Sequence, residues 1–482
     1  MQPKIKLLDD ELVEQILQEA FELMMDPGVK MQAPAAAELL VAAGARVEGE
    51  IAHIPQDLAR TALSTVPHEF FLYDRAGKPV VRYGGDAVHF DPGSSCVHML
   101  DPETLEHKPS QAADLVRLVQ VAEMLPQYAA QSTAVVCNDV PKEIGDLYRL
   151  FLVLLYSDKP IITGAFSSRN TQVMINLVAA DAGGREALRS KPRAVFDVCP
   201  SPPLNWSEFG GQNLIDLARA WVPAQMVSMP LAGATAPVTL AGAVVQHAAE
   251  CLSGITIHQL TQPGAPIVWG GAPAIFDMRA GTTPMGAIET AMIDAAYAQV
   301  GKQLGLPTHT YLGASDSKVI DAQAGLESGI TALVGALAGI NMISGAGMLD
   351  FLACQSAEKL VVDAEAIAMA LRLLNSIEAR TETLATAMFA HVGLHSDFLK
   401  LKETRKLFKQ EQYLPSSIID RGSLRAWQAA GSLDAFARAR VRTQELQAAY
   451  QRPQIKSEAK RAMFDVIERE AKRVGLERLP GV

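Results

Sequence analysis

The stretch THTYLGASDSKVIDAQAGLE, Thr308 to Glu327, passes directly from a short apolar strand into a polar loop and a helix start. The strand breaks at Gly313, where the backbone can turn sharply. A group of polar side chains then follows: Asp316, Lys318, Asp321, Gln323 and Glu327. A buried strand that leads through a polar loop into a helix is the repeating unit of a parallel α/β fold.

The same unit recurs along the chain. Seven further strand candidates, each followed by a helical stretch, begin at Ala87, Ala129, Pro160, Arg193, Ala224, Pro266 and Ile340. Eight such units favour a (β/α)8 barrel, which is a TIM barrel. An open doubly wound sheet is the alternative, but it usually has fewer strands and often a GxGxxG first turn, which is absent here. We therefore predict an α/β fold built on a TIM barrel.

The pattern also predicts three segments. Residues 1–84 mix helices with short strands and are expected to form an α+β cap or oligomer contact. Residues 85–395 form the barrel. Residues 396–482 form a charged helical extension packed on the barrel, which ends in a solvated helix.

Composition limits the function. The 482 residues are 49% hydrophobic and carry a net charge of -10, which excludes a nucleic-acid partner. Five scattered cysteines and the absence of a signal peptide predict a cytoplasmic protein, and no apolar run is long enough to cross a membrane.

Outer helices rich in alanine and glycine, such as LVGALAG, favour a homo-oligomer. The histidines lack the spacing of a zinc site, so we predict no metal of the protein's own.

In a TIM barrel the active site lies in the loops at the carboxyl ends of the strands. The polar residues after the seventh strand are therefore expected to face the site, and Asp316, Asp321, Gln323 and Glu327 are our catalytic candidates. Aromatic rings and carboxylates together suit a cation that cannot donate hydrogen bonds, such as a quaternary ammonium. Alternatively, Trp206 and Trp269 pack structurally, and Asp316 and Asp321 cap the next helix. The substrate-binding candidates are Asp91, Asn205, Trp206, Trp269, Arg279, Tyr311, Lys318, Asp350 and Phe351.

Three motifs resemble one known family. SPPLNW at Ser201–Trp206, SDSKVIDAQAGLE at Ser315–Glu327 and AGINMISGAGMLD at Ala338–Asp350 are similar to the trimethylamine methyltransferase family, in the right order. The resemblance runs from about Asp86 to Ile377. It implies a barrel that transfers a methyl group from a methylated amine to the cobalt of a corrinoid, which a separate small protein carries and docks at the barrel mouth.

The resemblance also implies a branch of the family. Founding members contain pyrrolysine, which we expect near Ser344–Phe351, and this sequence has none. A quaternary ammonium leaves as a neutral tertiary amine and needs no acid, whereas a tertiary amine must first be protonated or captured. The non-pyrrolysine branch, which includes glycine betaine methyltransferases, is therefore favoured, with glycine betaine as the expected methyl donor.

On this interpretation the site residues take specific roles. Trp206, Trp269, Tyr311 and Phe351 form a cage for the ammonium, and Arg279, Lys318 and Asn205 bind the carboxylate of a betaine. Residues at the glycine-rich turns let the flat corrinoid approach: Gly270, Gly271, Gly313, Gly345, Gly347 and Met348.

Three alternatives stay open. The methyl donor is another amine, such as carnitine, proline betaine or trimethylamine. The protein is a non-catalytic binder of quaternary amines. The barrel is an unrelated lyase or aldolase, for which Lys318 is only a loop candidate for a Schiff base.

Overall fold

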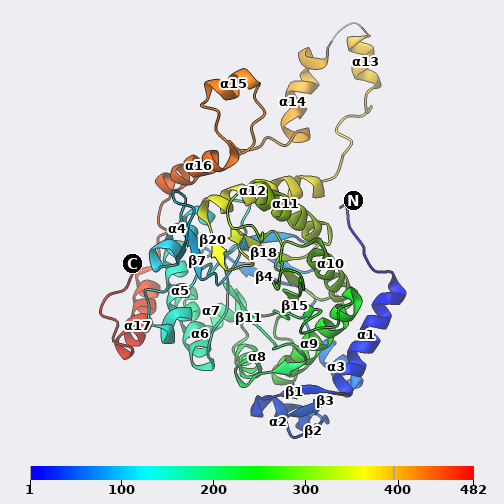
Figure 1. Ribbon diagram of the computed structural model, residues 1–482, viewed down its shortest axis with the longest axis vertical. Coiled ribbons are helices and arrows are strands. Elements are labelled where there is room, and N and C mark those ends of the chain that lie inside the picture. Colours follow the sequence, from blue (N-terminus) through cyan, green and yellow to red (C-terminus); the bar gives the residue numbers. More distant parts are fainter. Residues whose placement is uncertain (1, 395–396) are drawn as a thin grey trace.

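A computed structural model describes residues 2–394 and 397–482, and at its centre lies an eight-stranded parallel barrel (Figure 1). The strands are β6 (His89–Pro92), β9 (Gln131–Ser132), β10 (Ile161–Thr163), β11 (Ala194–Val198), β13 (Ala224–Met226), β15 (Ile267–Gly271), β17 (Thr308–Thr310) and β18 (Met342–Ala346). Hydrogen bonding follows the order β6-β18-β17-β15-β13-β11-β10-β9. The Ala129 amide donates to the Phe90 carbonyl and closes the ring between β6 and β9. The predicted TIM barrel and all eight strands are confirmed.

A ring of helices covers the barrel, one after each strand. They are α4 (Ala112–Glu123), α5 (Gly145–Tyr156), α6 (Ser168–Ala182) with the short α7 (Arg185–Ser190), α8 (Glu208–Ala220), α9 (Leu240–Thr261), α10 (Ile288–Gln303), α11 (Ala322–Leu337) and α12 (Ala357–Leu374). Strands that are covered by helices on the outside and filled on the inside are buried on both faces, so they read as apolar runs.

Small strand pairs lie in the loops. β7 (His98–Leu100), β8 (His107–Pro109), β19 (Met348–Leu349) and β20 (Cys354–Gln355) form one sheet, and β14 (Leu231–Ala232) pairs with β16 (Ala274–Ile275). β12 (Asn205–Trp206), in the loop after β11, pairs with β1 (Val29–Met31) from the N-terminal segment. The loops at the carboxyl ends of the barrel strands are therefore ordered by sheet pairing.

The N-terminal segment packs on the outside of the barrel and also closes one of its ends. α1 (Asp10–Met25), α2 (Pro34–Ala42), β2 (Arg46–Glu48), β3 (Ile51–His53) and α3 (Gln56–Leu63) form a layer against α8 and α9. The hairpin of β4 (Phe70–Tyr73) and β5 (Pro79–Tyr83) instead closes the amino-terminal end of the barrel. Leu72, Val81 and Tyr83 are fully buried there and form a floor.

The C-terminal segment leaves the barrel after α12. α13 (Thr386–Val392), α14 (Lys402–Glu411) and α15 (Leu424–Ala429) project from it in Figure 1. The 3-10 turn η2 (Phe398–Lys400) lies between α13 and α14 in the chain. α16 (Ala435–Ala449) then packs on α12 and α4, and α17 (Ser457–Arg473) packs on α6 and α5. The prediction of a solvated last helix is wrong in one respect, because Met463 and Ile467 of α17 are fully buried.

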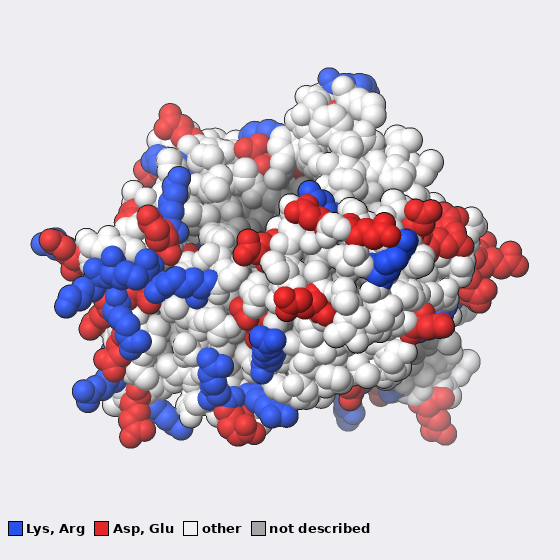
Figure 2. Space-filling view, turned by 90° about the horizontal axis from the view of Figure 1, so that it is seen from below, with Lys and Arg blue, Asp and Glu red and all other residues white. Residues whose placement is uncertain are grey.

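One helix of the described residues, α9, is long and apolar enough to cross a membrane. Of its most apolar window, 83% is buried within the molecule, so α9 is a core helix of the barrel wall. The outer surface mixes charges of both signs, and Figure 2 shows a deep hollow bordered mainly by uncharged atoms.

Candidate functional site

The interior of the barrel is layered. In the layer next to the floor, Ala130, Ile162, Val195, Val268 and Met342 pack on the hairpin as one buried apolar cluster. Because side chains alternate along a strand, the residues two positions further on face the same interior. That second layer contains Gly164, Asp197, Gly270 and Ser344, so the interior changes from apolar to polar within one layer.

One polar group of the second layer is sealed from solvent. The Ser344 hydroxyl donates to Asp91 Oδ1 at 2.5 Å, and His309 Nε2 lies 3.0 Å from the Ser344 oxygen. Ser344 therefore links the Asp91 carboxyl group to the His309 ring through two successive hydrogen bonds. Burial raises the pKa of Asp91 well above its usual range and lowers the pKa of His309 to about 3. Asp91 Oδ2 and His309 Nδ1 have no hydrogen-bond partner.

The second carboxyl group, Asp197, is reached by solvent. Gln225 Nε2 donates to its Oδ1 at 2.8 Å, and the Tyr311 hydroxyl donates to its Oδ2 at 3.3 Å. The Tyr83 hydroxyl in the floor donates in turn to Gln225, which fixes the amide. Desolvation inside the barrel raises the pKa of Asp197 to about 7, against the lowering effect of both hydrogen bonds. Asp197 is therefore a held carboxyl group that changes charge near neutral pH.

Above Asp197 a third layer of side chains follows, and solvent reaches both Asp197 and Cys199 through it. Its members are mostly small, because Gly93, Ala134, Ala272 and Ala346 stand two residues beyond the second layer in their strands. Solvent reaches the Cys199 thiol, although it is enclosed deeply enough for burial to raise its pKa to about 12. We call the solvent-reached region at Asp197 and Cys199, near the carboxyl ends of the strands, the chamber.

Two aromatic rings belong to the third layer: Tyr311 and Phe166. The Phe166 ring is 53% exposed and lies under the Arg149 guanidinium, 4.5 Å from its centroid. Arg149 extends from α5 and donates to Ser95 Oγ and to the carbonyls of Thr133 and Gly164. Its Nε has no partner. A carboxyl group, two rings and a buried guanidinium thus surround one solvent-reached space.

Neither predicted cage tryptophan faces the chamber, which corrects the sequence-based cage. The Trp269 indole points outward, donates to the Tyr297 carbonyl and lies against Gly301 of α10. The Trp206 indole donates to Ser253 Oγ and packs against Gly254 of α9. Both are fully buried, as the structural alternative predicts, and only Tyr311 of the predicted cage lies within the barrel.

The four catalytic candidates after β17 hold loops together. Asp316 accepts hydrogen bonds from the amides of Met285 and Gly286, and desolvation raises its pKa to about 6. Asp321 is the N-cap of α11 and accepts from the Ala324 amide. Glu327 accepts from Ser315 Oγ, from the Asp316 amide and from Gln323, a side chain on the exposed surface. The capping alternative is confirmed for Asp321, and none of the four shares a hydrogen bond with the chamber residues Asp197 and Tyr311.

Lys318, Asp350 and Phe351 meet at the rim of the barrel mouth. Lys318 Nζ lies 3.9 Å from the Phe351 ring centroid and 3.6 Å from Asp350 Oδ1. Asp350, Phe351 and Leu352 have positive φ angles of 51°, 55° and 69°, so the turn is left-handed over three residues that are not glycine. The other predicted carboxylate ligands lie elsewhere. Arg279 is 93% exposed and pairs with Asp277, and Asn205 is part of β12.

The predicted corrinoid-contact glycines have packing reasons of their own. A Cβ atom on Gly271 would meet the Ser228 carbonyl at 2.6 Å, and one on Gly345 would meet the Leu312 carbonyl at 2.4 Å. Gly347 lies against Gln355 and Leu360. Gly270 faces inward beside His309, Gly313 has a φ of 82° in the turn after β17, and Met348 is buried against Gly93.

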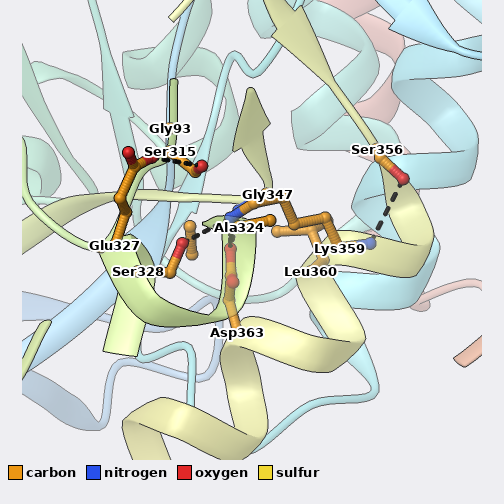
Figure 3. Close-up of polar contacts among 12 residues, drawn as sticks. Gly93, Ser315, Ala324, Glu327, Ser328, Gly347, Ser356, Lys359, Leu360 and Asp363 are labelled. Carbon is orange, nitrogen blue, oxygen red and sulfur yellow. Dashed lines mark hydrogen bonds and ion pairs between the residues drawn. The ribbon is translucent and has the colours of Figure 1, made fainter. Parts of the chain in front are cut away.

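A buried ion pair contacts the turn after β18, which contains Gly347 (Figure 3). Lys359 Nζ contacts Asp363 Oδ2 at 2.6 Å and Ser328 Oγ at 2.7 Å, and the same Oδ2 accepts from the Gly347 amide. Both charged groups are almost completely buried. The pair joins α11, α12 and the turn after β18.

Sequence reasoning missed Asp197, Gln225, His309 and Phe166. All four stand within predicted strands, in RAVFDVCP, AQMVSMPL, THTYLG and PIITGAF. A strand buried on both faces should be apolar, so a single acid, amide or histidine in its middle is a signal for an inward-facing functional group. Among the described residues, no group of three or more His, Cys, Asp or Glu side chains could hold a metal ion.

Comparison with known proteins identifies the family to which the chain belongs. It matches the trimethylamine methyltransferase family over residues 1–475. The chain belongs to this family. It is 34% identical over 443 residues to a trimethylamine methyltransferase of Methanosarcina thermophila, covering 89% of this chain and 90% of that protein. The corresponding enzyme of Desulfitobacterium hafniense is 31% identical, with 89% and 87% covered.

A glycine betaine methyltransferase of Desulfitobacterium hafniense is 28% identical over 98% of this chain and 99% of that protein. The crystal structure of Methanosarcina barkeri monomethylamine methyltransferase superposes with a TM-score of 0.54 at 12% identity, covering 92% of this chain and 89% of the other. That likeness shows the shared fold. The family resemblance predicted from the three motifs is confirmed, and the protein is a methyltransferase of the methylamine and betaine type.

Proposed function

We propose that this methyltransferase moves a methyl group from a quaternary amine to the cobalt(I) corrinoid of a partner protein. The observation that carries the proposal is Asp197, a carboxyl group inside the barrel that solvent reaches and that Gln225 and Tyr311 hold in place. A carboxylate in an enclosed, partly aromatic space attracts a cation that cannot donate hydrogen bonds. The sealed Asp91 lies in the same layer, and burial raises its pKa well above the usual range.

Each chamber group then has a role. Asp197 holds the ammonium by charge, and the Tyr311 and Phe166 rings contact its methyl groups. Because the floor is closed, the methyl group to be transferred points toward the mouth, where a near-attack contact of about 3–3.5 Å is needed. A cobalt(I) corrinoid supplies the nucleophile that accepts this methyl group. The amine leaves without its positive charge, so the chamber needs no proton donor for a quaternary substrate.

The rim suits a docking partner. Phe166, Val238 and Met278 stand in different loops at the carboxyl ends of the strands, and each is more than half exposed. Exposed apolar side chains grouped at one mouth are typical of an interaction surface. They support the proposal that a small corrinoid protein docks at this mouth, with the flat macrocycle facing the chamber.

Glycine betaine is the first substrate to test, with carnitine, proline betaine and trimethylamine as alternatives. A betaine carboxylate needs a cation, and Arg149, with its free Nε beside Phe166, is the nearest candidate.

The five free cysteines support a reducing, cytoplasmic location, and we propose that the protein works there as a homo-oligomer.

The test mixes the protein with cob(I)alamin and each amine and follows the visible absorption of cobalt(I). We expect this absorption to disappear with glycine betaine in wild type and to disappear at least about tenfold more slowly with Asp197→Asn. Transfer from an amine without a carboxylate, but not from betaines, would change the substrate and keep the mechanism. Binding of an amine by calorimetry without transfer, even with candidate carrier proteins, would instead support a non-catalytic binder.

A further inference from the structure

The segment 376–434, which we call the arm, lacks a core of its own. Among its described residues only Leu401 and Ile418 are buried, and α13, α14 and α15 contain no buried residue. Figure 1 shows the arm extending away from the barrel beyond α11 and α12. Helices of this length are marginal in water unless an apolar face is packed against something.

The exposed apolar side chains of the molecule are concentrated on this arm. Six large apolar residues of the arm are more than half exposed: Ile377, Leu384, Leu394, Leu399, Leu414 and Leu424. Single exposed apolar residues are normal on a surface, but a group of this size on one segment marks an interaction site. Together they present an apolar area on the order of 800 Å², about what one partner contributes to a standard interface.

The barrel offers a matching surface beside the root of the arm. Leu326 and Ile330 of α11 are 63% and 48% exposed, and Met369 and Leu373 of α12 are 51% and 45% exposed. A Cβ atom on Gly325 or Gly329 of α11 would meet nothing within 4 Å, so another helix could approach this face closely. We call these outer residues of α11 and α12 the outer face.

The arm is anchored at its root by polar contacts. Glu365 of α12 accepts hydrogen bonds from the Ser416 hydroxyl and amide and from the Tyr413 hydroxyl, and Arg438 of α16 donates to the Ile418 carbonyl. The root therefore has a fixed position on the barrel, while the apolar side chains beyond it are left uncovered. A fixed root and an open apolar segment are what an exchanged element needs.

We propose that the arm of one chain packs on the outer face of a second copy of the same chain, and that two chains exchange arms around a two-fold axis. The root of the arm is anchored on α12, which also carries half of the outer face, and a two-fold axis pairs both arms with both faces. The exchange goes beyond the catalytic proposal and does not depend on it.

The experiment compares solution mass by light scattering for three variants of the full chain. The arm variant carries Leu384→Asp and Leu399→Asp, the face variant carries Leu326→Glu and Ile330→Glu, and the control carries Val41→Asp on the exposed side of α2. Wild type and control should have at least twice the chain mass of 51.7 kDa. Each of the other two should fall by a factor of two, with an unchanged circular dichroism spectrum.

Mixing the arm variant with the face variant distinguishes arm-to-face packing from other arrangements of the two chains. A pair made of one arm variant and one face variant retains one intact arm on one intact face, so the mixture should regain the dimer mass. A face variant that stays dimeric would overturn the proposal in favour of arm-to-arm contact. A monomeric wild type, or variants that keep the wild-type mass, would show that the arm has a different occupant.

Discussion

At the scale of single residues, the central feature is a carboxyl group whose charge depends on pH within the working range of most enzymes. Asp197 is neutral well below pH 7 and charged above it, because desolvation raises its pKa to about 7. Only the charged form attracts an ammonium. On the proposed mechanism, the pH range in which the chamber binds an ammonium is therefore set by the balance between burial and two hydrogen bonds.

For Asp197→Asn we expect kcat/KM for a quaternary amine to fall roughly tenfold or more, since a charge pair in a partly solvated site contributes a few kcal/mol. The kcat/KM of wild type should rise with pH through about 7, and that of the variant should be flat. A variant that keeps both its rate and the pH-dependent rise would remove Asp197 from the site.

Stability should respond in the opposite direction. The folded-state pKa of Asp197 is raised above the unfolded value, so the folded state binds the extra proton and loses stability as pH rises toward 7. Asp197→Asn should therefore be more stable than wild type at pH 8, by up to about 4 kcal/mol, and equal to it near pH 4. Urea unfolding at the two pH values measures the difference.

Tyr311→Phe tests the hydrogen bond that holds this carboxylate. The phenol donates to Asp197 Oδ2 and lowers its pKa, so removing the hydroxyl should move the midpoint of the kcat/KM profile to higher pH. Tyr73→Phe, in the hairpin outside the chamber, is the control. An unmoved midpoint with reduced kcat would mean that the ring acts by packing alone.

At the scale of secondary-structure elements, the mouth is held by contacts between successive βα units. Asp316 joins the loop after β15 to the loop after β17, and the Lys359–Asp363 pair joins α11 and α12 to the turn after β18. The loop carboxylates that sequence suggested as catalytic are in this way part of the frame around the chamber. They fix the geometry of the rim without entering the interior.

Lys359→Met should destabilise the fold by about 3–5 kcal/mol, because the buried Asp363 then loses its counter-ion and keeps only neutral hydrogen-bond partners. The double variant Lys359→Met/Asp363→Asn should recover part of this loss. Arg442→Met ends only the exposed pair with Glu445 and should cost about 0–1 kcal/mol. Equal losses for Lys359→Met and Arg442→Met in urea unfolding would contradict the buried-pair argument.

At the scale of the whole molecule, the barrel cannot be separated from its N-terminal segment. α9 is buried on nearly every side because α1 and α3 cover its outer surface, and the hairpin of β4 and β5 fills the end of the barrel. The predicted boundary at residue 84 therefore falls within one continuous core. The boundaries of the three segments remain predictions.

Residues 85–482 expressed alone should be insoluble, because the outer surface of α9 and the apolar floor layer would be exposed together. Co-expression of residues 1–84 as a separate chain should restore soluble protein, since the two pieces share a core. Soluble, monomeric 85–482 with a wild-type melting temperature would show that the boundary separates independent domains.

The barrel architecture could be predicted from the sequence, but the residues that line its interior could not. The eight strand–helix units are visible because apolar periodicity depends on local residue order. Trp269 and Val268 show the limit. They are neighbours in one strand, and only the closed barrel decides that the valine faces the axis and the indole faces α10. Likewise, Asp316 follows a strand as a catalytic residue would, but its partners come from a loop some thirty positions away.

The closed floor has a consequence for kinetics. Leu72, Val81 and Tyr83 fill the amino-terminal end of the barrel, so on the proposed mechanism the amine enters through the mouth that the proposed carrier also occupies. The amine must then enter before the carrier binds, and the demethylated product must wait until the carrier departs. Steady-state kinetics should show a compulsory order, and a large excess of carrier should inhibit by trapping the empty enzyme.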